Sequence, residues 1–95
     1  MIYFGKYQIH EWNKPKISAW SRTFYRGDLY MGHIQICTNL GDQDTYQPRF
    51  NFLEEIKTLY FNMYGPTAKE FYSVDEAKAH VDSFIEKLQK LKAFL

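Results

Sequence analysis

Aromatic rings alternate with guanidinium groups in one short segment of the chain. Trp20 and Phe24 supply the rings, and Arg22 and Arg26 supply the charges. Because successive side chains of a β-strand point to opposite faces, we expect all four on one face of a strand. Rings fill pockets of a protein or stack on bases, whereas guanidinium groups bind carboxylates or phosphates. With His33 on the next expected strand, these residues predict a partner-binding surface.

A basic turn lies beside this segment and gives a second interpretation. Lys14 and Lys16 stand between Trp12 and Trp20. Lysines beside a ring-bearing sheet suit contact with the nucleic-acid backbone, since neutralised phosphates supply most non-specific affinity. Lysines in an exposed turn are also ordinary solvated surface, and the net charge of only +1 favours that interpretation. Nucleic-acid binding is therefore the alternative function rather than the leading one.

Catalytic and metal-binding patterns are weak throughout the chain. His10 and His33 suggest an acid–base pair of a small hydrolase, but nothing in their spacing brings them together. Asp42 and Asp44 lie in a polar loop that lacks the further oxygen ligands of a calcium site. The single cysteine excludes an internal disulfide bond and a cysteine-rich zinc site. We therefore expect no enzyme activity, no cofactor and no metal.

Length and composition point to one small globular domain over residues 1–95. Hydrophobic residues make up 45% of the chain and charged residues 24%, which are values of ordinary folded proteins. No apolar run approaches the roughly 20 residues that cross a membrane. The first residues resemble a strand and not a signal peptide. We expect a soluble protein of the cytoplasm with no membrane partner.

The first half of the chain has the composition of β-strands. Strands are expected over residues 2–11, 17–25 and 29–38, with a hairpin at Gly27 and a polar loop over residues 39–45. Uninterrupted alternation through a two-residue turn places Ser21, Thr23 and Tyr25 on the face of Ile34 and Ile36, which is the expected core face. The residues expected on the other face, away from that core, are Trp20, Arg22, Phe24, Arg26, Met31, His33, Gln35 and Cys37.

The second half changes to helical periodicity. Apolar residues from Phe52 to Met63 predict a helix capped by Asn51 and stopped at Gly65, although a strand through residues 57–63 is a competing interpretation. If this segment folds over the Trp20/Phe24 face, that face is part of the hydrophobic core and not a binding surface. Ser73 begins a capping box before a long amphipathic helix. Its apolar stripe comprises Ala77, Val81, Phe84, Ile85, Leu88 and Leu91.

Together these elements predict an α+β fold. We expect an antiparallel sheet of three or four strands, a middle helix, and a long C-terminal helix packed on the Ile34/Ile36 face. The chain ends in Ala93-Phe94-Leu95, where two large apolar side chains predict either packing back on the sheet or a homodimer contact through the C-terminal helix.

The order of the elements resembles that of small accessory proteins of phages and mobile elements. The resemblance is carried by the aromatic segment Lys69–Tyr72 and by Ser73 to Ala77, which opens the closing helix. That group includes inhibitors of host defence nucleases and small nucleic-acid binders, and no catalytic residue carries over from it. The resemblance implies a non-catalytic protein that binds and inhibits a host defence complex.

Overall fold

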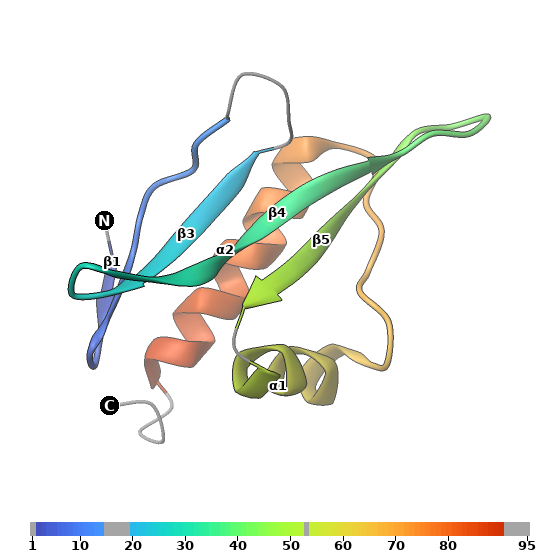
Figure 1. Ribbon diagram of the computed structural model, residues 1–95. Coiled ribbons are helices and arrows are strands. Elements are labelled where there is room, and N and C mark those ends of the chain that lie inside the picture. Colours follow the sequence, from blue (N-terminus) through green and yellow to red (C-terminus); the bar gives the residue numbers. More distant parts are fainter. Residues whose placement is uncertain (1, 15–19, 53, 91–95) are drawn as a thin grey trace.

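The computed structural model describes residues 2–14, 20–52 and 54–90 and has an α+β architecture (Figure 1). An antiparallel sheet follows the chain in the order β1-β2-β3-β4-β5. Within these described ranges there are two helices, and the second lies toward the C-terminal end, as predicted. The strands are β1 (Ile2–Phe4), β2 (Tyr7–Ile9), β3 (Ser21–Arg26), β4 (Leu29–Asn39) and β5 (Thr45–Phe52), and the helices are α1 (Glu54–Tyr64) and α2 (Val74–Lys90).

The described part of the chain forms five strands, more than the predicted three or four, and the first extra strand comes from a turn near the N-terminus. Gly5 has a φ of 53°, a conformation that glycine adopts without steric cost. The chain reverses there, so Phe4 pairs with Tyr7 and Ile2 pairs with Ile9. The expected single strand over residues 2–11 is therefore a short hairpin.

The second extra strand is β5, where the sequence predicted a loop followed by a helix. Pro48 disguises this strand, because proline cannot donate to a sheet ladder. It is tolerated because β5 is the last strand of the sheet, and among the described residues its outer side forms only an isolated bridge, between Tyr46 and Phe71. Asn51 pairs with His33 within the ladder, so its predicted role as a helix cap is wrong. Helix α1 begins only at Glu54, and the competing strand over residues 57–63 is also wrong.

A β-bulge between β3 and β4 changes which residues face the core. Near the turn, Tyr25 pairs with Tyr30, but the next pair is Phe24 with Gly32, so Met31 has no partner across the ladder. Gly32 has a φ of 128°, in the region that favours glycine. One extra residue reverses the facing of everything beyond it.

The predicted face assignment of β3 is therefore wrong. Arg22 pairs directly with Ile34 and lies on the Ile34/Ile36 face. Thr23 pairs with His33 on the opposite face. The hairpin at Gly27 was predicted correctly, but the bulge beyond it was not.

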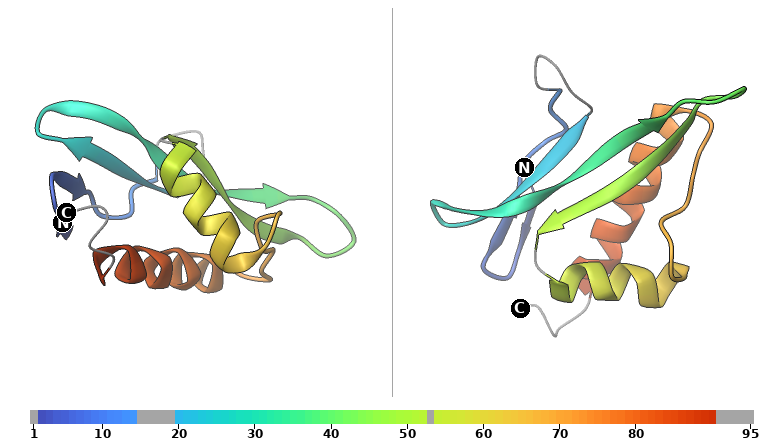
Figure 2. Two further views of the ribbon diagram at one scale, coloured as in Figure 1. Left: turned by 90° about the horizontal axis from the view of Figure 1, so that it is seen from below. Right: turned by 45° about the vertical axis from the view of Figure 1, so that its right-hand side comes forward.

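Helix α2 covers the Ile34/Ile36 face, as predicted (Figure 2). The hydroxyl of Ser73 accepts a hydrogen bond from the Glu76 amide at 3.1 Å, which caps the helix start. The described part of its apolar stripe is fully buried: Ala77, Val81, Phe84, Ile85 and Leu88. Leu91 and the proposed dimer residues 93–95 lie outside the described residues.

Helix α1 adds to the same core rather than covering the second face. Tyr60 is fully buried, and its ring centroid lies 4.4 Å from that of Phe50 on β5 and 5.3 Å from that of Phe84 on α2. The chain leaves α1 at Gly65, whose amide donates to the Phe61 carbonyl, as the predicted stop requires. Among the described residues, no helix lies on the other face of the sheet (Figure 2).

Candidate functional site

The predicted ring-and-arginine surface lies mostly on the face that the helices cover. Phe24 is fully buried in the core, and Arg22 retains only 3% of its exposure. Trp20 packs at the edge of the same core, where the Lys78 ammonium group lies 3.5 Å from its ring centroid. These residues hold the sheet to α2, so they form no open binding surface.

Arg22 is held in a hydrogen-bonded network between the sheet and α2. Its Nε donates to the His10 carbonyl at 2.9 Å, and its Nη1 forms an ion pair with Asp82 Oδ1 at 3.0 Å. The indole Nε1 of Trp12 donates to the same carboxylate at 3.0 Å. A buried charge needs such partners, because an unpaired one is costly. Trp12, predicted as a stacking ring for nucleic acid, thus has a structural contact.

The other predicted site residues are spread apart. Arg26 is exposed beside the β3–β4 turn, and Lys14 is exposed after β2. Lys16 lies outside the described residues. His33 lies on the face opposite to Arg22 and Phe24. The structure therefore does not bring the predicted partner-binding residues together.

The strongest candidate site is the sheet face that carries no helix, which we call the open face. Its side chains follow from the ladder pairs of His33 with Thr23 and with Asn51, and from alternation along the strands. They are largely polar or aromatic rather than aliphatic. They include Gln8, His10, Ser21, Thr23, Tyr25, Tyr30, His33, Gln35, Cys37, Asn39, Thr45, Gln47, Arg49 and Asn51.

Neighbouring rings form a continuous row across the open face, and we call His10, Tyr25, Tyr30 and His33 the ring row. The ring centroids of His10 and Tyr25 lie 4.6 Å apart, and those of Tyr25 and Tyr30 lie 5.9 Å apart. Tyr30 Oη and His33 Nδ1 share a hydrogen bond of 2.6 Å. Tyr30 is 52% exposed, so the row is held by its neighbours and still open to solvent.

Polar side chains continue the ring row along β4. His33 Nε2 and Gln35 Oε1 lie 3.1 Å apart, and Gln35 Nε2 donates to Cys37 Sγ at 3.1 Å. At the far end of the open face, Asn39 Nδ2 donates a hydrogen bond to Glu70 Oε1. This chain of contacts fixes the side-chain conformations before any partner arrives, which lowers the entropy cost of binding.

A shallow hollow opens where the ring row meets the segment after β2. It has a volume of about 510 Å³ and is lined by His10, Glu11, Trp12, Asn13, Thr23 and Tyr25. His10 and His33 both lie on the open face, but Thr23 of β3 lies between them, since it pairs with His33 and its carbonyl accepts from the His10 amide. The described ring contacts join each histidine to a tyrosine, whereas the hydrolase hypothesis requires a contact between the two histidines.

Sequence reasoning missed the two tyrosines that form the centre of the ring row. Tyr25 and Tyr30 flank the hairpin turn and pair with each other whether or not a bulge follows. Their symmetrical placement around Gly27 predicts that they pair, but it does not show which face of the sheet they occupy. Uninterrupted alternation assigned them to the core face instead.

The described residues contain no cluster of side chains that could hold a metal ion. Within the same ranges, none of the helices has the length and apolar character needed to cross a membrane. Comparisons with protein-family models, with curated proteins and with solved structures found no match to this chain.

Proposed function

We propose that this protein is a non-catalytic binding protein that recognises another protein through the open face of its sheet. The ring row carries this proposal, because its tyrosines and histidines are half-buried or exposed and have no packing partner among the helices described. Tyrosine is enriched at the centres of protein interfaces, where its ring is buried and its hydroxyl forms hydrogen bonds.

The charge of the open face favours a protein over a nucleic acid. Arg49 is exposed at one part of the face, while Glu70 accepts hydrogen bonds at another. A backbone-binding surface needs several cations that neutralise phosphates, whereas a mixed polar surface with rings is typical of protein interfaces. The resemblance to phage accessory proteins extends the proposal to a host enzyme complex as the partner, which the protein would inhibit.

Affinity capture with matched tyrosine variants tests the proposal. The native protein, Tyr30→Ala and Tyr72→Ala would each be immobilised and exposed to lysate of the native host cell. Tyr72 is 67% exposed and lies before α2, away from the ring row, so it controls for the loss of any exposed ring. We expect a protein retained by the native chain and by Tyr72→Ala but lost by Tyr30→Ala, as identified by mass spectrometry.

Circular dichroism and urea unfolding would accompany the capture, to show that Tyr30→Ala remains folded. A partner retained equally by all three proteins would move the binding surface away from the ring row. Retention lost equally in both variants would show a general dependence on exposed rings and would also contradict the proposal.

Nucleic-acid binding is the second candidate, and one observation favours it. An antiparallel sheet with adjacent exposed rings is a surface on which successive bases can stack. Labelled single-stranded and double-stranded oligonucleotides titrated at two salt concentrations would decide it. Binding that weakens steeply with salt and is lost in Tyr30→Ala supports this candidate, whereas no binding at low salt excludes it.

A further inference from the structure

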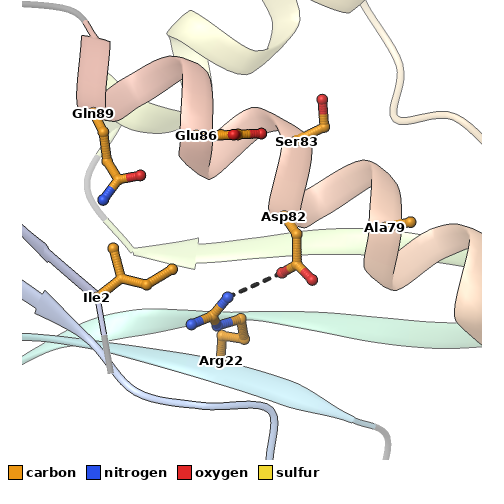
Figure 3. A pocket seen from close by; sticks show the side chains of 7 residues that line it. All are labelled: Ile2, Arg22, Ala79, Asp82, Ser83, Glu86 and Gln89. Atoms are coloured by element: carbon orange, nitrogen blue, oxygen red, sulfur yellow. Dashed lines mark hydrogen bonds and ion pairs between the residues drawn. The ribbon is translucent and has the colours of Figure 1, made fainter.

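A groove on the covered side of the molecule has features of a second site. It lies between α2 and β1 and is lined by Ile2, Arg22, Ala79, Asp82, Ser83, Glu86 and Gln89 (Figure 3). Its volume of about 570 Å³ is within the usual range for small-ligand pockets, roughly 300–1,000 Å³. The ring row lies on the opposite face of the sheet, so the groove is separate from the surface proposed above.

Arg22 presents an unused hydrogen-bond donor at this groove. Its Nε and Nη1 have partners, but its buried Nη2 has none among the described residues. Figure 3 shows its guanidinium end between Asp82 and Ile2. The residue is 3% exposed, so bulk water does not substitute freely for a partner. A buried donor without an acceptor destabilises the folded state, and a ligand oxygen placed there would recover part of that cost.

The charges around the groove restrict what that ligand can be. The positive charge of Arg22 is already balanced by Asp82. Glu86 is exposed at the groove, and the described residues contain no ion-pair partner for it. A simple anion would therefore be repelled, whereas a neutral oxygen acceptor joined to a cationic group would satisfy both features.

We propose that the groove binds an amino amide, in which a carbonyl oxygen accepts from Arg22 Nη2 and a nearby ammonium group faces Glu86. The amino-terminal residue of a peptide and a small free amino amide share this chemistry. Ile2 and Ala79 supply apolar surface for a side chain of the ligand. The indole of Trp12 donates to Asp82, so its NMR signal reports on events at the groove.

Four related probes test the assignment on the full-length protein: leucinamide, leucine, N-acetyl-leucine and isoamylamine. They are respectively a cation with a carbonyl group, a zwitterion, an anion, and a cation without a carbonyl group. Titrations would follow the Trp12 indole and Arg22 Nε–H signals. We expect saturable binding of leucinamide, about tenfold or more tighter than that of N-acetyl-leucine. Isoamylamine should also bind more weakly, because it offers no acceptor to Nη2.

A matched pair of variants separates the groove from general electrostatics. Glu86→Gln should weaken leucinamide binding by about two- to fivefold, as expected for loss of one exposed ion pair. Glu76→Gln removes an exposed carboxylate of the same helix outside the groove and should leave binding unchanged. Both changes are at exposed positions, so the variants should fold.

A Leu-Gly-Gly amide peptide distinguishes the two sources of the ligand. Binding equal to or tighter than that of leucinamide indicates a peptide amino terminus, and rejection of the peptide indicates a small amino amide. The proposal is overturned if leucinamide causes no saturable shift, or if N-acetyl-leucine and isoamylamine bind as well as leucinamide does. In that case an ordered water molecule is the natural partner of Arg22 Nη2.

Discussion

The two faces of the sheet differ in what holds their aromatic residues in place. Phe24 and Tyr25 are neighbours in the sequence, yet Phe24 is fully buried beneath the helices and Tyr25 is a half-buried member of the ring row on the open face. The covered face gains stability from burial, with Arg22 admitted only because Asp82 pairs with it. The open face gains its order from ring contacts and hydrogen bonds instead. Aromatic content alone therefore says little about function until each ring is assigned to a face.

Replacing one ring from each face should produce the largest difference in stability. Phe24→Ala leaves a cavity in the core and should lower the free energy of unfolding by about 3–5 kcal/mol. Tyr30→Ala removes a ring that is 52% exposed and should cost less than about 1 kcal/mol. Urea unfolding followed by circular dichroism measures both. Equal losses for the two variants would mean that the face assignment is wrong.

The β-bulge that determines which side chains face the core depends on Gly32. Substitution of Gly32 should have the next largest effect on stability. At a φ of 128°, a side chain is strained, so Gly32→Ala should cost about 1–3 kcal/mol. Gly41 is the matched control, since its nearest contact for an added Cβ, the Gln43 carbonyl oxygen, is an ordinary 3.7 Å away. Gly41→Ala should change stability by less than about 0.5 kcal/mol.

Urea unfolding of the two glycine variants makes this comparison directly. A neutral Gly32→Ala substitution would indicate that the ladder in solution has no bulge at this position. Arg22 and Phe24 would then lie on the same face as His33, and the originally predicted surface would be restored.

The sequence was sufficient where the signal was local. Ser73 and the apolar spacing after it predicted α2, because a helix cap and a helical stripe are both encoded within a few residues. Gly27 likewise predicted the β3–β4 hairpin. The α+β class followed from these elements alone.

The sequence was insufficient where one residue changes which face of the sheet many other residues occupy. The sequence pattern does not reveal Met31 as the extra residue, because the side chains before the bulge and those after it each alternate normally along β4. Pro48 concealed a strand that is tolerated only at the sheet edge, and position within a sheet is a tertiary property. The candidate site was missed for the same reason, since the bulge determines which rings reach solvent. Its residues became identifiable only from the pairing of the strands.

The smallest predicted effect is a change of stability with pH, and it arises from a histidine on the covered side of the sheet. His80 Nε2 and Tyr60 Oη share a hydrogen bond of 2.8 Å beside the core. Burial lowers the pKa of His80 below its ordinary value of 6.5, and Lys69 and Lys87 lower it further. The unfolded chain therefore binds a proton at His80 more readily than the folded chain does. The contribution of His80 to the free energy of unfolding should be constant above about pH 7.5 and fall as the pH drops through about 6.5.

His80→Gln keeps a polar partner for Tyr60 but removes this titration. Burial also raises the pKa of Tyr60, so its hydroxyl stays protonated in this range and the difference between the two proteins reports on His80. Unfolding free energies measured between about pH 8 and pH 5 should decline less in the variant than in the native protein. Parallel declines would show that His80 binds its proton equally in the folded and unfolded states, which would contradict the lowered pKa.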